Sequence, residues 1–381
     1  MHPTTADSAV PVLTPQALAR DLARRDLTDP ADGPHAMQLL VDDLTRALAS
    51  AWPSTSVQVH RADPVVDAAD NYDRLGYSPD AVTRDVRYTR YVTPTRLLRT
   101  HTSAMIPPLL RKLAGAPPAD VTLVCPGIVY RRDAIDRLHT GTPQQTDIWR
   151  ISPDRHMTGD DLRAMVVLVV EALMPGHRHR VNDVIHPYTD GGLEIEVEHG
   201  QEWVEIGECG VAGPAMLAGA GLASTTGGLA MGLGLDRILM LRKGVPDIRL
   251  LRSEDPRIAG QMLDLAPYRP VSSRPAMVRD LSVAVDDADD DETIGDRVRD
   301  SLGDDAPAVE AVEVLSSTAA ADLPPAAAAR LGIGEGQRNV LVRVVLRHLD
   351  RTLTAEDANT LRDRVYAAIH RGSRHQWAAQ S

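Results

Sequence analysis

The residues best suited to chemistry in this 381-residue chain lie in the segment 227–257. Two glycines, Gly232 and Gly234, stand directly before an apolar stretch that predicts a helix over 235–241, and this stretch carries Arg237. Glycines let a backbone approach a polyanion closely, and the planar guanidinium of arginine matches the geometry of phosphate. A glycine-rich turn, a helix start and an arginine therefore favour binding of a nucleoside triphosphate, although the same pattern often has only a structural role.

The same segment resembles the third signature motif of class II aminoacyl-tRNA synthetases, in the version carried by phenylalanyl-tRNA synthetases. The run Gly-Leu-Ala-Met-Gly-Leu-Gly-Leu-Asp-Arg at 228–237 matches that motif, with Met231 in place of a phenylalanine and Asp236 in place of a glutamate. Val-Pro-Asp-Ile-Arg follows at 245–249, close to the family's Ile-Pro-Asp-Ile-Arg. The resemblance implies activation of an amino acid with ATP and Mg²⁺, followed by its transfer to tRNA.

A second stretch is similar to the second class II motif, which consists of a strand, a loop and a strand. It begins at Gly127, reaches Arg131 and continues through a loop that holds Asp133 and His139. The resemblance implies that Arg131 contacts the α-phosphate and Arg237 the γ-phosphate, and that Asp133 and His139 belong to the ATP site. An attack of a carboxylate on a phosphate brings two anions together, so the protein supplies position and cations rather than a covalent nucleophile.

Three further matches imply an amino-acid pocket. In a run Arg-Thr-His-Thr-Ser, His101 and Ser103 match residues that contact the substrate carboxylate, although a His-Thr-Ser run alone is as often a capped turn before a helix. Gln145 and Asp147 match the family's Gln-x-Glu pair, which holds the substrate ammonium, with a carboxylate that is one methylene shorter. Ala230, in the third motif, is implied to belong to the same pocket.

The side-chain part of this pocket departs from the family pattern. Two phenylalanines that clamp the substrate ring are replaced by His186 and Tyr188, which are aromatic but polar at the rim. Glu208 stands where the family has a glycine, and a buried carboxylate is costly unless it is paired. Either Glu208 faces away from the pocket, or the pocket recognises something other than a bare phenyl ring. Glu205 matches a carboxylate that coordinates Mg²⁺ on the triphosphate.

The elements that must position these groups predict an α+β protein. We expect an N-terminal segment over 1–34, a catalytic domain over 35–266, a linker over 267–276 and an anticodon-binding domain over 277–381. The resemblance implies a mixed antiparallel sheet flanked by helices for the catalytic domain. The last region alternates strands and helices in the β-α-β-β-α-β order of a smaller ferredoxin-like domain.

The C-terminal region is similar to the ferredoxin-fold anticodon-binding domain of these synthetases, which implies tRNA-Phe as a partner. The net charge of the whole chain is −12, so any RNA contact needs a local basic face. Residues 280–335 hold 15 acidic and 3 basic residues, whereas residues 336–381 hold 4 acidic and 8 basic ones. The expected contacts with tRNA therefore lie in the second half: Arg343, Arg347, Arg351 and Arg371.

The composition predicts a cellular location and shows one anomaly. Two cysteines fit neither a disulfide framework nor a zinc site, and we find neither a membrane-spanning run nor a presequence, so we expect a cytoplasmic protein. The anomaly is that the chain contains no phenylalanine, where ordinary usage would place on the order of ten. Three explanations are open: translation without charged tRNA-Phe, protection against an analogue loaded on tRNA-Phe, and drift in a GC-rich genome.

Two functions from different classes remain open. The first is ATP-dependent charging of tRNA-Phe with phenylalanine or a close analogue by a monomer or homodimer, as the fusion of both domains resembles the single-chain enzymes of organelles. The second is a synthetase-like paralogue that binds or activates an amino acid for regulation or biosynthesis without charging tRNA. Intact phosphate ligands at Arg131, Glu205 and Arg237 favour the first, whereas the acidic C-terminal domain and the altered pocket favour the second.

Overall fold

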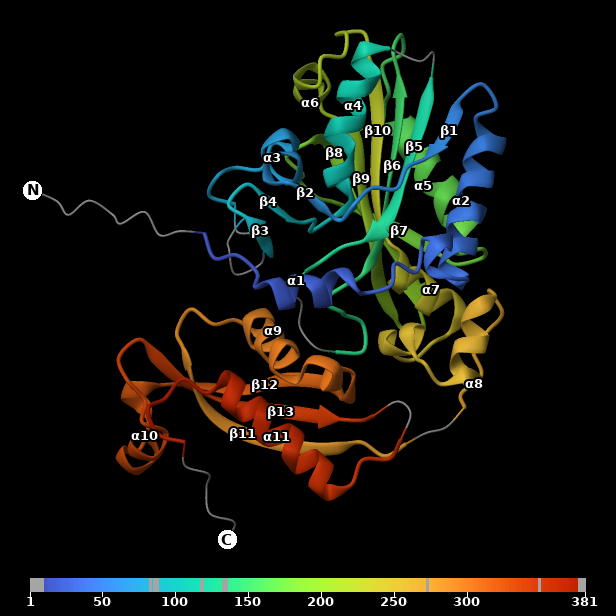
Figure 1. The fold of residues 1–381 in the computed structure, drawn as a ribbon. Coiled ribbons are helices and arrows are strands. Elements are labelled where there is room, and N and C mark those ends of the chain that lie inside the picture. Colours follow the sequence, from blue (N-terminus) through green and yellow to red (C-terminus); the bar gives the residue numbers. More distant parts are fainter. Residues whose placement is uncertain are drawn as a thin grey trace, which may run out of the picture. The chain divides into compact units, whose positions relative to one another are not determined.

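The computed structural model describes residues 10–81, 84, 89–116, 120–131, 136–271, 274–348 and 351–375 (Figure 1). The chain divides into two compact units. The first unit comprises residues 1–131, 142–245 and 262–267, and the second comprises 132–141, 246–261 and 268–381. The domain limits expected from the sequence stay predictions. In the part of the chain that the structure describes, no helix is long and apolar enough to cross a membrane.

The first unit is built on a seven-stranded sheet with the strand order β1-β5-β6-β10-β9-β8-β7. Neighbouring strands are antiparallel, except that β1 and β5 run parallel, which gives the mixed antiparallel sheet that we expected. Its strands are β1 (Ser56–Val59), β5 (Val121–Ile128), β6 (Gln144–Ser152), β7 (His179–Asp183), β8 (Thr189–His199), β9 (Glu202–Ala212) and β10 (Gly227–Gly234).

Helices cover both faces of this sheet (Figure 1). On one side lie α2 (Ala36–Ala51), α5 (Gly159–Leu173) and α7 (Leu235–Lys243), and on the other lie α4 (Ile106–Gly115) and α6 (Pro214–Gly219). Apolar residues at helical spacing predict a helix over 35–51, and α2 confirms it, with His35 as the N-cap. The residues of one stripe are buried: Met37, Leu40, Val41, Leu44 and Leu48.

The remaining elements of the first unit are small. The helix α1 (Pro15–Leu22) begins where the Thr14 hydroxyl accepts a hydrogen bond from the Ala17 backbone, and a threonine followed by proline is a sequence pattern that predicts such a start. A three-stranded sheet has the order β2-β4-β3. Its strands, and the short helix that follows the first of them, are β2 (Val65–Asp67), α3 (Ala68–Asn71), β3 (Tyr91–Thr93) and β4 (Arg96–Leu98).

One local prediction is wrong, because Gly232 and Gly234 do not form a turn. They belong to β10, which pairs with β6 on one edge and with β9 on the other. Backbone hydrogen bonds on both edges hold the segment extended, and α7 begins only at Leu235. The glycines therefore bring a flat stretch of bare backbone to the middle of the sheet.

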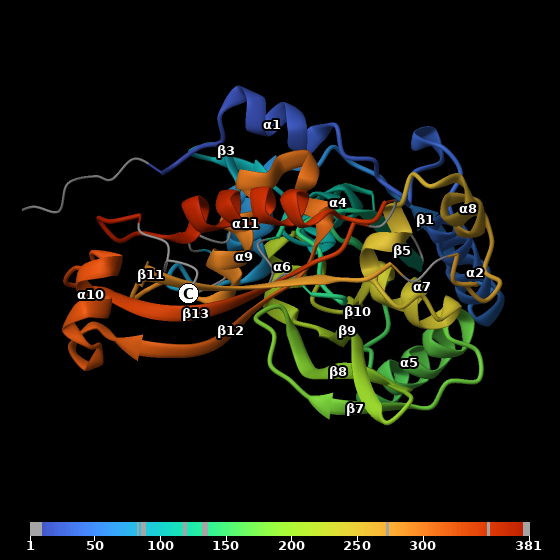
Figure 2. The ribbon, with the colours of Figure 1, turned by 90° about the horizontal axis from the view of Figure 1, so that it is seen from below.

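The second unit contains a three-stranded antiparallel sheet with the order β11-β13-β12. Two helices, α9 and α11, pack on the same face of this sheet (Figure 2) and bury Ile294 and Val365 against Val283 and Val342. Its elements are α8 (Pro256–Ala259), β11 (Met277–Asp286), α9 (Asp291–Leu302), β12 (Val309–Ala319), α10 (Pro325–Leu331), β13 (Gln337–Leu346) and α11 (Ala355–Ile369). The first five elements of the expected β-α-β-β-α-β order occur, but the short helix α10 is inserted between β12 and β13, and no final strand occurs in the described residues up to 375.

A buried ion pair generates a prediction about stability. Arg90 donates to Asp21 of α1 at 2.8 Å, and the two side chains are 8% and 1% exposed. Replacing one partner of such a pair leaves a buried charge, so Asp21→Ala should lower the free energy of unfolding by roughly 3 kcal/mol. The matched control is Asp42→Ala, on an exposed position of α2, for which we expect a change within about 0.5 kcal/mol in denaturant titration. Equal losses in the two variants would contradict the prediction.

Candidate active site

Three adjacent strands align the candidate site residues in one row. Gly232 of β10 lies opposite Asp147 of β6 on one side and opposite Glu208 of β9 on the other. Residues that face one another across a sheet point to the same side, so both carboxylates project from one face with a glycine between them. Two strand spacings separate their Cα atoms by ~10 Å. Because Gly232 has no side chain, a gap lies over it, with the carboxylate of Asp147 at one end and that of Glu208 at the other.

Asp147 is the buried end of the row. One oxygen accepts hydrogen bonds from Thr102 Oγ1 at 2.7 Å and Ser103 Oγ at 3.1 Å, and the other accepts one from Trp149 Nε1 at 3.2 Å. Burial raises the pKa of Asp147 to about 6, although these three donors lower it. The carboxylate is therefore ionised at neutral pH but poorly hydrated, which suits it to attract a cation such as an ammonium group.

The floor of the gap consists of small residues. A Cβ atom placed on Gly232 or on Gly234 would meet no atom closer than 3.8 Å, so neither glycine is required by close packing. Ala230 lies two residues before Gly232, on the same face, and pairs with Trp149. Gln145 pairs with Gly234 and shares the face with Asp147. The structure thus brings the predicted residues Gln145 and Ala230 to the same open stretch of sheet.

His101 and Ser103 come to this face from the turn before α4. Ser103 contacts Asp147, whereas the buried His101 ring stacks on Tyr77 with 5.8 Å between ring centroids. Burial, with the nearby charge of Arg131, lowers the pKa of His101 to about 4, so the imidazole is neutral at pH 7. Contact of these two residues with a substrate carboxylate stays a prediction.

Tyr77 is a pocket residue that the sequence reasoning missed. Besides His101, its ring contacts Tyr188 at a centroid distance of 6.3 Å. Burial raises the pKa of Tyr77 to about 12, and the charges of Glu208 and Asp147 add to that rise. Tyr77 therefore lies within electrostatic reach of both ends of the row. The signal available in the sequence was the run Asn-Tyr-Asp at 71–73, which resembles the Asn-Phe-Asp run of the same synthetases and lies four residues before Tyr77.

The two predicted clamp residues lie together at the outer end of the row. Tyr188 stacks on Trp149 at 6.1 Å and on His186 at 5.9 Å between ring centroids. His186 Nε2 lies 2.7 Å from Glu208 Oε2, and its side chain is 10% exposed. Glu208 lies in the row with Gly232 and Asp147, so it does not face away from the site, which was the first of the two alternatives left open by the sequence. The second alternative, a pocket that recognises something other than a bare phenyl ring, stays a prediction.

Glu205 and Arg237 form a second polar group on the same sheet. A bulge at Ile206 shifts the register of β9, so that Glu205 lies opposite Glu196 while Glu208 lies opposite Glu194. Arg237, in the first turn of α7, donates to the Glu205 carbonyl oxygen at 2.7 Å and lies 3.4 Å from its carboxylate. The bulge therefore re-aims Glu205 to the face that carries Glu208, next to a guanidinium.

The remaining predicted ATP ligands are only partly placed. Arg131 ends the extended run after β5, and its charge lowers the pKa of Glu208, after the larger effect of the His186 hydrogen bond. Asp133 lies outside the described residues. His139 belongs to the second unit, where its Nδ1 atom lies 2.7 Å from Asp136. The structure thus relates Arg131 to the row, and the roles of Asp133 and His139 stay predictions.

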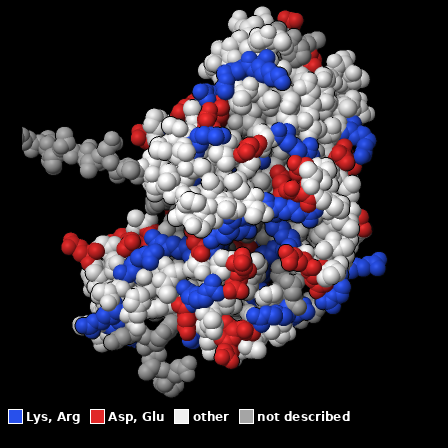
Figure 3. Space-filling view, viewed as in Figure 1, with Lys and Arg blue, Asp and Glu red and all other residues white. Residues whose placement is uncertain are grey.

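Most of the arginines expected to contact tRNA have acidic partners within the second unit. Arg343 pairs with Asp280 at 2.9 Å, Arg347 with Glu310 at 2.5 Å and Arg351 with Asp357 at 2.6 Å. Arg371 Nη1 approaches the carbonyl oxygen of His370 at 3.5 Å. On the face shown in Figure 3, acidic and basic side chains are interspersed. The role of these arginines in tRNA binding stays a prediction.

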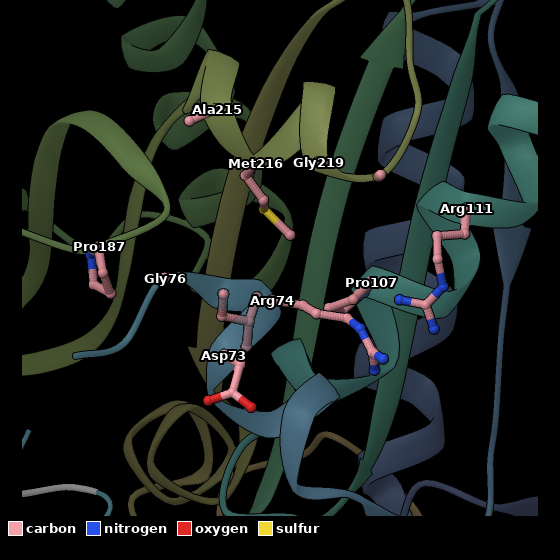
Figure 4. A pocket seen from close by; sticks show the side chains of 11 residues that line it. Asp73, Arg74, Gly76, Pro107, Arg111, Pro187, Ala215, Met216 and Gly219 are labelled. Carbon is pink, nitrogen blue, oxygen red and sulfur yellow. The ribbon is translucent and has the colours of Figure 1, made fainter. Parts of the chain in front are cut away.

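A separate cavity of ≈ 280 Å³ lies beside the clamp segment (Figure 4). Arg74 and Arg111 extend toward each other at its edge, below Met216, and both pair with the buried carboxylate of Asp70 at 2.8 and 3.0 Å. Pro187, which separates the two clamp residues, forms part of its wall. The cavity is therefore a neighbour of the row rather than a part of it.

Comparison with known proteins agrees with this geometry. Residues 32–262 match the family model described as tRNA synthetases class II core domain (F). The chain is 33% identical over 238 residues to the phenylalanine–tRNA ligase alpha subunit of Prochlorococcus marinus (strain MIT 9313), covering 62% of this chain and 69% of that protein. It is 26% identical over 362 residues to the chloroplastic/mitochondrial phenylalanine–tRNA ligase of Arabidopsis thaliana, covering 91% and 77%. The chain belongs to the class II tRNA synthetase core family.

Proposed function

We propose that this protein activates phenylalanine or a close aromatic analogue with ATP and transfers it to tRNA-Phe. The observation that carries the proposal is the row on the central sheet, in which a buried carboxylate faces an open glycine floor. The pair formed by Arg237 of α7 and Glu205 of β9 adds a cation and a second carboxylate. The relatives named above are phenylalanine–tRNA ligases, and one of them aligns with 91% of this chain.

In the proposed first step, a carboxylate oxygen of the amino acid attacks the α-phosphorus of ATP, and the bond from this phosphorus to the pyrophosphate oxygen breaks. Asp147 holds the ammonium group, so the carboxylate points along the open floor. Arg131 neutralises charge on the α-phosphate and Arg237 on the leaving phosphates. In the second step a ribose hydroxyl at the 3′ end of the tRNA attacks the activated carbonyl, and AMP leaves.

A magnesium ion fits the residues that are present. Mg²⁺ is usually held in nucleotide sites by one or two carboxylates together with substrate phosphates. Glu205 offers a carboxylate that is 45% exposed and that lies beside the phosphate-binding guanidinium of Arg237. We infer that Glu205 holds this ion, which would neutralise charge on the triphosphate. The oligomeric state, monomer or homodimer, and a cytoplasmic location stay predictions.

The second candidate function is a paralogue that activates or binds an amino acid without charging tRNA. The pairing of Arg343, Arg347 and Arg351 with carboxylates supports this candidate, because paired arginines offer less net charge to a phosphate backbone. Two assays separate the candidates: ATP–pyrophosphate exchange over the twenty amino acids, and formation of aminoacyl-tRNA with purified tRNA-Phe. Exchange without aminoacyl-tRNA would establish the paralogue.

The first prediction concerns the leaving phosphates. Arg237→Ala should lower the rate of ATP–pyrophosphate exchange by on the order of a hundredfold, because a preorganised charge at the transferring phosphates is lost. The thermal midpoint of unfolding checks that the fold survives. Arg46→Ala is the matched control, since Arg46 lies on α2 with a side chain that is 72% exposed. An exchange rate that does not change in Arg237→Ala would show that the nucleotide site is elsewhere.

The second prediction concerns pH. Ionised Asp147 attracts the ammonium group, and the raised pKa of about 6 means that this carboxylate becomes protonated as the pH falls through 6. The kcat/KM for the amino acid should therefore be constant just above pH 6 and fall by about tenfold for each pH unit below it. Asp147→Asn should show a low kcat/KM without this step. A step near pH 4 in the wild-type protein would contradict the proposed burial of the group.

The third prediction concerns the missing phenylalanines. A chain with no phenylalanine can be synthesised when phenylalanyl-tRNA is scarce, which supports a backup or resistance synthetase, and it also avoids incorporating an analogue that is loaded on tRNA-Phe. Cells whose housekeeping enzyme is blocked should grow when this protein is expressed, and their tRNA-Phe should carry an aromatic amino acid. Mass spectrometry of that amino acid separates a backup, which loads phenylalanine, from an enzyme that loads an analogue. No growth and uncharged tRNA-Phe would overturn the inference.

A further inference from the structure

The outer end of the row holds a hydrogen-bonded chain that the proposed reaction does not use. If His186 donates from Nε2 to Glu208 Oε2 at 2.7 Å, its Nδ1 atom is an acceptor, and Thr189 Oγ1 lies 3.3 Å from it. This arrangement, Thr189 to His186 to Glu208, fixes the orientation of the imidazole ring. Gly192 makes room for it, because a Cβ atom there would lie 2.8 Å from His186 Nδ1.

This chain leaves one carboxylate oxygen of Glu208 available. Oε2 is occupied by His186, whereas Oε1 has no hydrogen-bond partner among the described residues, and the side chain is 42% exposed. An ionised carboxylate can only accept hydrogen bonds. The hydrogen bond from His186 lowers the pKa of Glu208, so the group is ionised at neutral pH. Glu208 Oε1 is therefore an oriented hydrogen-bond acceptor for a molecule bound over Gly232.

The position of this acceptor relates it to a bound amino acid. Glu208 shares its row with Asp147, and only Gly232 lies between them. An amino acid whose ammonium group is held at Asp147 extends its side chain over the glycine floor, beside the contacting rings of Tyr77 and Tyr188. The hydroxyl of Tyr77 lies close enough to both carboxylates for their charges to add to the rise of its pKa that burial causes. A polar group on the far side of the substrate would meet Glu208.

We propose that the His186–Glu208 pair determines substrate specificity by accepting a hydrogen bond from a donor on the aromatic ring of the amino acid. The substrate class is thus an α-amino acid with a hydroxyl- or amino-substituted ring, and an unsubstituted phenyl ring is a poorer substrate. The proposal rests on the proposed activation of an aromatic amino acid. A bare ring leaves the Glu208 carboxylate partly desolvated without a partner, which is unfavourable.

The experiment compares ring substituents that differ in hydrogen bonding. ATP–pyrophosphate exchange is measured with phenylalanine, para-tyrosine, meta-tyrosine, 4-aminophenylalanine and 4-fluorophenylalanine, the last of which has no donor. At least one donor-bearing ring should exceed phenylalanine and 4-fluorophenylalanine in kcat/KM by roughly 10- to 100-fold, as expected for a hydrogen bond to a charged group. Calorimetric titration with the same amino acids measures their dissociation constants, and thus the same preference in binding alone, without adenylate formation.

Variants assign that preference to the pair. Glu208→Leu removes the acceptor and should abolish the advantage of the donor-bearing ring over phenylalanine in kcat/KM. Glu194→Leu is the matched control, because Glu194 lies in the same row on β8 and instead faces Asn182 at 3.3 Å. His186→Phe should reduce the preference less than Glu208→Leu, because the acceptor remains but loses its orientation.

The outcomes separate the two proposals. Exchange that is equal for all rings, or a preference that Glu208→Leu leaves unchanged, would overturn the role of Glu208 while the proposed activation stands. Exchange with no amino acid would overturn the proposed activation. In that case the titration still decides the specificity: tighter binding of a donor-bearing ring supports it, and equal or absent binding of all five amino acids overturns it.

Discussion

The buried carboxylate of Asp147 is the interaction on which the site depends. A carboxylate without water is unfavourable unless donors replace the water, and here two hydroxyls and an indole N–H do so. These donors come from two places in the chain, the turn before α4 and the strand β6 itself. Because these donors bind the same carboxylate, they hold the turn before α4 against one face of the sheet. This is the face proposed to bind the substrate.

The antiparallel pairing of β6, β10 and β9 then determines which other side chains lie on the same face of the sheet as Asp147. Because β10 carries glycine at the centre of the row, the next side chain on that face is two strands away, at Glu208. The bulge at Ile206 adds Glu205 to the same face, although alternation along a regular strand would turn it away. A single irregularity in β9 therefore lets one strand serve both the proposed phosphate end and the side-chain end of the site.

Much of this arrangement could be predicted from the sequence, because long periodic segments and motif order are local signals. The apolar stripe of α2 and the Thr14-Pro15 pair at the start of α1 are such signals, and both helices occur. The extended state of Gly232 could not be predicted, since it depends on hydrogen bonds to strands 85 and 24 residues away in the chain, measured to Asp147 and Glu208. Tyr77 was missed for the same reason: only the fold brings it against His101 and Tyr188.

The polar residues His186, Tyr188 and Glu208 and the missing phenylalanines have one explanation in common. The family's ring clamp uses phenylalanine, and its replacement by His186 and Tyr188 could be a by-product of excluding that residue from the whole chain. Exclusion alone does not account for Glu208, which replaces a glycine and would be unfavourable beside an apolar ring. An enzyme that loads a ring-substituted analogue onto tRNA-Phe would need such an acceptor, and a chain without phenylalanine codons would not incorporate that analogue into itself. The absence of phenylalanine from the chain and the geometry of the His186–Glu208 pair thus support the same class of substrate, an amino acid with a ring-substituted side chain.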